Sequence, residues 1–340
     1  MKKVILLLCT ALVCAAQTSF PVTQGKVYKL ERIAEGVYYA TGGTGSNNIV
    51  IVNDNDVVLV DTGTTPATAR ALLADIKLVT PKPVTTVVNT HFHYDHTNGN
   101  SIFGPEVEIL AHDFVRKAIT TFDVLNTEPM KTYKTVAMPQ LIADLTKQAA
   151  AEQDPAKKKS LEDQLASAKL LPDQVAEVRP TPPTKTYSDQ MILKRGNREI
   201  RLLHLGRAHT EGDTLIYLPQ EKILCTGDLL QGRRLPYMGD GFFDEWVSGL
   251  EKIKGMDIAW ILPGHGVPFS DKSLIGNLQA YLNDVTNKVD VFRRQEAPPE
   301  TAAQKVDMTS HAKNFPQITG PGVEIRGVRR IYEWYAEREH

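Results

Sequence analysis

The first part of the chain alternates short hydrophobic runs with turn-forming residues. These runs predict five strands, at residues 27–33, 37–41, 49–52, 57–60 and 84–88. Pro66 then begins a helix that extends to about residue 79, because the apolar residues after it recur at helical spacing, at Ala69, Leu72, Leu73 and Ile76. Strand, helix and strand in this order predict a β-α-β unit, whose functional residues are expected at the carboxyl end of its strands.

The second half of the chain repeats this logic. Its hydrophobic runs predict two hairpins and a later strand, at 191–194 with 199–205, at 214–218 with 222–226, and at 259–262. A helix is expected near residues 246–254, and helical spacing returns from 271 to about 294 and again near Trp334. We therefore expect an α/β fold in which two sheets face one another with helices outside.

A helical segment separates the two halves. After a strand at 106–111, residues 113 to about 178 carry apolar residues at helical spacing, and Asp154-Pro155 provides a cap and a first helical position. The proline-rich connector at 179–184 is expected to be extended. We interpret 113–178 as an inserted helical hairpin that either roofs the active site or contacts a second subunit, so the oligomeric state, monomer or dimer, stays open.

The densest polar cluster follows the hydrophobic run at 84–88. His91, His93, Asp95 and His96 fall within six positions, and in extended backbone His91 and His93 share one face. Imidazoles together with a carboxylate are ligands for Zn²⁺, Fe²⁺ or Mn²⁺ at neutral pH. A polar loop that happens to hold three histidines is the weaker interpretation at this density, so the sequence predicts a metal site.

Three further motifs follow in order, each at the end of an apolar run. They are Gly206-Arg207-Ala208-His209-Thr210-Glu211-Gly212-Asp213, Cys225-Thr226-Gly227-Asp228 and Pro263-Gly264-His265-Gly266. Together with the H-x-H-x-D-H arrangement after residue 90, this series resembles the metallo-β-lactamase superfamily over residues 27–270. The resemblance implies the four-layer αβ/βα sandwich of that family, here with a helical insertion at about 113–178 and a C-terminal helical extension at 271–340.

The resemblance also implies a ligand set. His91, His93 and His209 correspond by position to the ligands of one metal, and Asp95, His96 and His265 to those of a second. Asp228 corresponds to the carboxylate that bridges them. Seven ligands exceed the four that one zinc takes, so we expect two Zn²⁺, with iron or manganese as alternatives. An Asp at the end of a preceding strand, Asp61 here, supports the metal loop in the resembling family.

Two divalent ions about 3.5 to 4 Å apart can share a water and stabilise it as hydroxide. We expect this hydroxide to attack a carboxyl-type electrophile (a lactone, β-lactam, ester or thioester), with Asp95 as the catalytic residue whose free oxygen orients it or accepts its proton. The lactamase branch usually has Cys or Ser at the position of Asp228, and one class has a substrate-binding Lys at that of Gln231. The site therefore looks closer to glyoxalase II and lactonases.

The expected substrate is a small, neutral or weakly anionic molecule. No dedicated cation stands beside Asp228 in the sequence, and Arg207 and Arg233 are only weak candidates. An apolar wall is expected from the inserted helices together with aromatic residues, namely Phe114, Phe122, Tyr133 and Tyr237. The histidines His112 and His204 and the thiol of Cys225 are expected to be structural, and the glycine-rich loop 42–48 to be a mobile flap or a plain hairpin turn.

Two other functions remain open on the same ligands. One is a mononuclear iron dioxygenase of the same fold, and the other is an exported binding domain without catalysis. A nucleic-acid-processing enzyme is disfavoured because the formal net charge is only −1.

The N-terminus predicts export. Residues 1–16 combine Lys2 and Lys3 with an apolar segment and a small-residue cleavage region, as in a signal peptide, and the apolar segment is too short to span a membrane. A lipoprotein anchor at Cys14 is the alternative. Cleavage leaves Cys225 as the one cysteine of a periplasmic or secreted chain, which excludes an internal disulfide. We expect no membrane association after cleavage.

Overall fold

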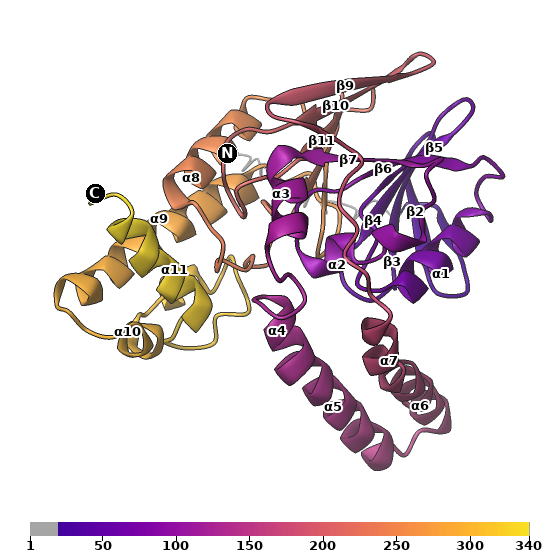
Figure 1. Ribbon diagram of the computed structural model, residues 1–340. Coiled ribbons are helices and arrows are strands. Elements are labelled where there is room, and N and C mark those ends of the chain that lie inside the picture. Colours follow the sequence, from indigo (N-terminus) through magenta and orange to yellow (C-terminus); the bar gives the residue numbers. More distant parts are fainter. Residues whose placement is uncertain (1–19, 340) are drawn as a thin grey trace, which may run out of the picture.

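Two β-sheets pack face to face, with helices on their outer faces (Figure 1). The computed structural model describes residues 20–339. The predicted four-layer αβ/βα sandwich with a helical insertion is confirmed. The predicted signal peptide, with Cys9 and Cys14, lies outside the described residues, so export stays a prediction. Among residues 20–339, no helix combines the length and apolar character needed to cross a membrane.

The first sheet has eight strands that lie side by side in chain order. Neighbours are antiparallel up to β5 and parallel from β5 to β8, because α1 (Pro66–Ile76) and later connections return the chain to the same end of the sheet. The carboxyl ends of β5, β6 and β7 therefore share one edge. The strands are β1 (Val22–Gln24), β2 (Lys29–Ala34), β3 (Val37–Thr41), β4 (Asn48–Val52), β5 (Val57–Val60), β6 (Val84–Val88), β7 (Glu108–His112) and β8 (Lys185–Tyr187).

The second sheet has five strands in the order β13-β12-β11-β10-β9. Strands β9 to β12 form antiparallel pairs. The helix α8 (Phe243–Lys254) is the crossover that makes β13 parallel to β12. Both predicted hairpins are confirmed. The strands are β9 (Gln190–Arg195), β10 (Arg198–Leu203), β11 (Leu215–Leu218), β12 (Ile223–Gly227) and β13 (Trp260–Pro263).

Three apolar layers hold the sandwich together. Side chains from both sheets fill the central layer, and α1 packs on the outer face of the first sheet. The outer face of the second sheet is covered by α8 and by the C-terminal helices α9 (Ser273–Arg294), α10 (Pro299–Lys305) and α11 (Ile325–Ala336). The C-terminal helices thus share a core with α8, and Trp246 at the centre of that core is fully buried.

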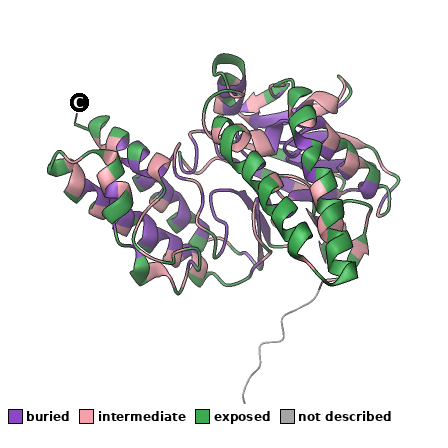
Figure 2. Cartoon of the chain, turned by 90° about the horizontal axis from the view of Figure 1, so that it is seen from below, coloured by how far each residue is buried: buried purple, intermediate pink, exposed green. Residues whose placement is uncertain are grey.

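The insertion begins with α3 (Asp113–Thr121), which packs on the body, and then forms a hairpin that projects away from the sheets (Figure 1). Its outer surface is mostly exposed (Figure 2). Asp154 caps α6 by accepting hydrogen bonds from the backbone N–H groups of Ala156 and Lys157, as predicted. The hairpin elements are α4 (Met130–Thr132), η2 (Tyr133–Ala137, a π-helical turn), α5 (Met138–Ala151), α6 (Pro155–Lys169) and α7 (Leu171–Ala176).

Two short edge strands were not expected from the pattern. β1 and β8 have three residues each, and they are strands only because β2 and β7 provide their hydrogen-bond partners. The predicted helix after Pro66 ends at Ile76, three residues earlier than expected. The remaining short helices are α2 (Tyr94–Thr97), η1 (Asn100–Ile102) and η3 (Thr309–His311).

Candidate metal centre

The four polar motifs meet at one edge of the sandwich. The segment after β6 leaves the sheet at Asn89 and places Asp95 and His96 on α2. His209 lies between β10 and β11, Asp228 directly follows β12, and His265 comes two residues after β13. All of these side chains lie in segments that follow buried strands, which is where open α/β sheets place their sites.

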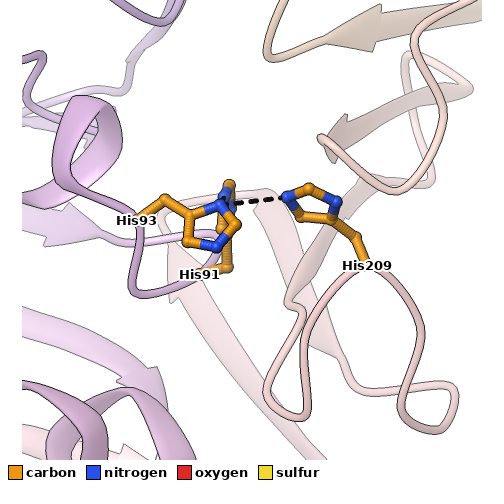
Figure 3. Close-up of side chains that lie close together, drawn as sticks. All are labelled: His91, His93 and His209. Carbon is orange, nitrogen blue, oxygen red and sulfur yellow. Dashed lines mark hydrogen bonds between the residues drawn. The ribbon is translucent and has the colours of Figure 1, made fainter. Parts of the chain in front are cut away.

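Three histidines form the first group, which we call the His triad. His93 Nδ1 lies 3.0 Å from His91 Nε2 and 3.1 Å from His209 Nε2, and all three side chains are buried. Figure 3 shows the rings of His91 and His93 together and that of His209 facing them from the opposite side. The ligand atoms of the three residues lie within 4.8 Å of one another, the compact arrangement that a single ion requires.

Asp95, His96 and His265 form the second group, the mixed triad. His265 Nε2 is 3.0 Å from Asp95 Oδ2, and His96 Nε2 is 3.7 Å from the same oxygen. Asp228 stands between the two groups. Its Oδ1 is 3.5 Å from His96 Nε2, and its Oδ2 is 3.9 Å from His209 Nε2. The structure thus brings all seven predicted residues together, with Asp228 in the position that a bridging carboxylate would need.

The buried atoms of the centre fit a bound cation. His96 Nε2 and Asp228 Oδ1 are buried without a hydrogen-bond partner, an arrangement that is costly unless a ligand satisfies them. The neighbouring residue is Gly264, and any Cβ there would come within 2.4 Å of Asp228 Oδ1. Glycine therefore leaves space beside this oxygen. Imidazole nitrogens and carboxylate oxygens that lie this close together are suitable ligands for Zn²⁺, and Fe²⁺ and Mn²⁺ also accept them.

The second ring nitrogen of each buried histidine is held by another group, which aims the first at the centre. His96 Nδ1 lies 2.7 Å from Asp61 Oδ2, and Asp61 also accepts hydrogen bonds from the backbone N–H and the hydroxyl of Thr90. The supporting role predicted for Asp61 is therefore confirmed. His91 Nδ1 lies 3.0 Å from the Thr90 hydroxyl.

The remaining two histidines are held by a loop that the sequence did not single out. His209 Nδ1 lies 2.9 Å from the carbonyl oxygen of Tyr237, and His93 Nε2 lies 2.9 Å from Asp240 Oδ2. Asp240 is 147 positions from His93, so no local pattern could have paired them.

The two groups differ in charge state. Burial and the neighbouring histidines lower the pKa of His91 well below its usual value and that of His209 to about 3. In the mixed triad, burial also opposes protonation, but Asp228 and Asp95 outweigh it and raise the pKa of His265 to about 10. Burial raises the pKa of Asp95, yet His96 and His265 outweigh it and hold that pKa at about 2.

A pocket of about 290 Å³ opens over the centre. His93, Asp95, Asp228 and His265 line it on the side of the metal centre, and its other walls come from α2, the start of the hairpin, the loop after β12 and the start of α11. These wall residues are Tyr94, Pro129, Thr132, Tyr133, Ala137, Gln231, Arg234, Leu235, Tyr237 and Arg326. The beginning of the insertion therefore lines the site, as one of the two interpretations of this segment expected.

Several predicted pocket residues lie elsewhere. Phe114 and Phe122 pack around Phe92 and are absent from the pocket wall, whereas Tyr133 and Tyr237 are part of it. Arg207 forms an ion pair with Glu245, and Arg233 donates to the carbonyl oxygen of Lys313. Neither arginine lines the pocket.

Two other arginines do. Arg326 donates to Glu324 and Glu128 and lies 4.9 Å from the ring centre of Tyr237. The side chain of Arg234 forms no hydrogen bond or ion pair with residues 20–339. The expectation that no dedicated cation stands at the site is therefore wrong. Arg326 was missed because it lies 61 positions after His265, in a helix expected only from its spacing.

The remaining candidates are structural, as predicted. His112 and His204 stack with ring centres 4.1 Å apart, and His204 Nδ1 lies 3.0 Å from the carbonyl oxygen of Asp213. Cys225 is a fully buried free thiol whose pKa is raised by burial. The glycine-rich residues 42–47 connect the antiparallel strands β3 and β4, so a hairpin connection is confirmed there.

The sequence is similar to one known protein family and to several known proteins. Residues 41–106 match the family model of the metallo-beta-lactamase superfamily. A linear primary-alkylsulfatase of Pseudomonas sp. is 24% identical over 294 residues, which cover 82% of this chain and 53% of the relative. The chain thus spans about half the length of that relative.

Two solved structures resemble the fold. A metallo-beta-lactamase from Erythrobacter litoralis aligns with a TM-score of 0.52 at 17% identity, over 78% of this chain and all of the other. A sec-alkylsulfatase from Pseudomonas sp. aligns with a TM-score of 0.57 at 16% identity, over 90% of this chain and 50% of the other. At these identities the structures show a shared fold.

Proposed function

The chain belongs to the metallo-β-lactamase superfamily and has the groups of a metal-dependent hydrolase, and on this basis we propose that it hydrolyses a carboxyl-type ester, a lactone or a related carboxyl derivative. The observation behind this proposal is the position of all seven donors, which converge at the floor of one pocket. A domain that only binds would be expected to have lost some of these ligands, and all seven are present.

The His triad would hold one ion, the mixed triad the other, and Asp228 both. Two bound divalent ions, zinc in our proposal, supply a water that is ionised near neutral pH and polarise the electrophile. The chain itself contributes the orientation of the donors, since Asp61, Asp240 and the Tyr237 carbonyl each hold one histidine ring in place.

Asp95 is the residue that we assign to proton transfer. Its pKa of about 2 keeps it ionised, and it lines the pocket floor where the scissile bond would lie. An ionised carboxylate in this position can accept the proton that the attacking water releases. Tyr133 and Tyr237 contribute their rings to the pocket wall.

The arginines change the substrate that we expect. Arg234 and Arg326 line the pocket together with Asp228 and His265. Arg326 is already matched by Glu324 and Glu128, whereas Arg234 is free to bind an anionic group of the substrate. We therefore infer an anionic carboxyl derivative in place of a neutral one.

Hydrolysis of a sulfate ester is the second candidate. The similarity to a linear primary-alkylsulfatase extends over 82% of the chain, and the sec-alkylsulfatase structure aligns over 90% of it. A sulfate ester also carries the negative charge that Arg234 could bind. The aligned part is about half of each alkylsulfatase.

Purified zinc-loaded protein should be assayed against a panel of p-nitrophenyl esters, lactones, β-lactams, thioesters and alkyl sulfates. We expect turnover of a carboxyl derivative, with a loss of at least about 100-fold in His93→Ala, because that variant loses a ligand outright. Turnover of alkyl sulfates alone would replace the first candidate by the second. Oxygen uptake by an iron-loaded form would establish a dioxygenase, and no turnover at all would favour the binding domain.

Arg234 has a matched control in its neighbour. Arg234→Ala should raise KM for anionic substrates about tenfold and leave kcat largely unchanged, because a charge-assisted hydrogen bond of roughly 1.5 kcal/mol or more is lost. Arg233→Ala removes an equally exposed arginine that lies outside the pocket. Equal effects of the two substitutions would contradict anion recognition by Arg234.

A further inference from the structure

A second and larger hollow lies next to the metal centre, between the helical hairpin and the body of the protein. We call it the hairpin groove, and its volume is about 800 Å³. On the body side it is lined by Gly42, Gly43 and Thr44 of the β3–β4 loop and by α1. On the hairpin side it is lined by α5, α6 and α7, where Leu141 is 42% exposed within the groove.

One continuous helix has residues at both the groove and the metal centre. The segments α4, η2 and α5 are contiguous, so the chain is helical from residue 130 to 151. Tyr133 and Ala137 on this helix line the pocket over the metal centre, and Leu141 and Leu145 line the groove. These side chains recur every four positions along about 18 Å of helix, so each lies next to the one before it, although the series winds around the helix.

The β3–β4 loop makes the same connection from the opposite wall. Gly42 to Thr44 line the groove, and two residues later the Ser46 hydroxyl donates to the carbonyl oxygen of Asp95 at 2.7 Å. The backbone N–H of Asn47 donates to the carbonyl oxygen of Gly264 at 2.7 Å, next to His265. The helix and the loop therefore each have residues at the groove and residues at the metal centre.

The volumes of the two spaces indicate which part of a substrate each could hold. The pocket over the metal ligands, about 290 Å³, has room for a small polar head group beside Arg234, whereas the groove, at about 800 Å³, has room for a longer chain. Leu141, Leu145, Ala71 and Ala168 make part of the wall of the groove apolar, and polar side chains of α6, among them Lys159 and Asp163, line the rest. Exposed leucines beside a polar site are typical of a surface that binds an apolar group.

We propose that the hairpin groove binds the aliphatic chain of the substrate, so that the substrate is an amphiphile whose anionic, hydrolysable head lies at the metal centre. The assignment of the head rests on the proposed function. The assignment of the tail rests on the groove and its two connections, and it holds for a carboxylic or a sulfuric ester alike. The hairpin insertion thus acts as the tail-binding part of the enzyme.

Binding should be measured apart from turnover. Isothermal titration calorimetry of the zinc-loaded protein with butyrate, octanoate and dodecanoate should give affinities that rise about twofold to fourfold per methylene, since each methylene leaves water on entering the groove. Dodecanoate that binds no more tightly than butyrate would overturn the proposal.

The helix offers a matched pair of variants. Leu141→Lys places a charge in the groove, whereas Val136→Lys places one on the same helix at a residue that is 58% exposed and lines neither space. We expect Leu141→Lys to weaken dodecanoate binding about tenfold or more and to leave butyrate binding unchanged. Equal losses in both variants would overturn the proposal, as would a dimer of the wild-type protein that dissociates in Leu141→Lys alone, because a second copy would then occupy the groove.

Turnover of 4-acetoxybenzoate, 4-octanoyloxybenzoate and 4-dodecanoyloxybenzoate, esters that carry an anionic carboxylate, by the same proteins separates the two proposals. Chain-length-dependent binding without turnover would leave the groove assigned and contradict the hydrolase. Turnover with no dependence of KM on chain length, together with equal fatty-acid affinities, would contradict the groove and leave the hydrolase in place.

Discussion

The His triad and the mixed triad lie at the same sheet edge, but their surroundings shift the pKa values of their histidines in opposite directions at His209 and His265. His91 and His209 are buried among other imidazoles, so their pKa values are lowered and both rings are neutral at pH 7. His265 faces Asp95 and Asp228, so its pKa is raised to about 10 and it holds a proton when no cation is present. His91 and His209 can therefore accept a metal directly, whereas a metal must displace a proton from His265.

The two groups also differ in their support. His96 is fixed by Asp61, which is 1% exposed and directly follows β5. His93 is fixed by Asp240, whose side chain is 33% exposed and belongs to the loop before α8. The mixed triad is thus anchored in the core of the sandwich, and the His triad depends partly on a surface loop.

Among the tests of this comparison, removal of both ions should have the largest effect on activity and stability. A chelator should abolish hydrolysis and lower Tm, since the bound ions stabilise the folded state only. Elemental analysis should give about two zinc ions per chain, because seven donors exceed the four that one zinc takes. A single tightly held ion, with no gain in activity when zinc is added, would contradict the binuclear centre.

Asp228→Ala should break the connection between the two groups. The substitution removes the carboxylate that lies between the His triad and the mixed triad, so kcat should fall by more than the roughly 100-fold typical of losing an outer partner. Cys225→Ser, three positions earlier, is the control, because the thiol is buried away from the pocket. Comparable losses of kcat in the two variants would show that Asp228 is not a bridge.

Asp240→Ala should weaken the His triad selectively. Without its carboxylate the ring of His93 loses the partner that orients it, and zinc affinity at that group should fall about 10- to 100-fold. Competition with a chromophoric chelator measures this affinity, and the mixed triad should retain its ion. Asp244→Ala, which removes an exposed carboxylate paired with Arg338, should leave both affinities unchanged. A loss from the mixed triad instead would refute the assigned role.

Mild acidification should have the smallest effect, namely a loss of zinc from the mixed triad before the His triad. A raised pKa means that protons compete for His265 at any pH below about 10, whereas they compete for His209 only below about 3. Zinc affinity at the mixed triad should therefore fall up to about tenfold per proton and per pH unit as the pH drops, while the His triad holds its ion. Zinc release measured against pH should show two steps, and simultaneous release would contradict the charge difference.

The strand pattern and the ligand motifs were open to prediction because both depend on short stretches of chain. β3, β5 and β6 have the predicted limits, since alternating or continuous apolar runs bury the same residues in any sandwich. His91, His93, Asp95 and His96 are close in the chain, and the other three motifs each end a strand, so their convergence follows from the order of the strands. Their role as ligands stays a prediction.

The sequence by itself determined the class of the fold, the donor set and the presence of a helical insertion, because local spacing and strand-end chemistry are written in neighbouring residues. Only the tertiary structure decided that Asp240 orients His93, that Arg326 reaches the pocket from the C-terminal helix and that Leu141, on the same helix as Tyr133, lines a groove. Each of these depends on how distant segments pack. A side chain's partner across the fold is set by the summed geometry of the sheets and helices between them, which no local pattern contains.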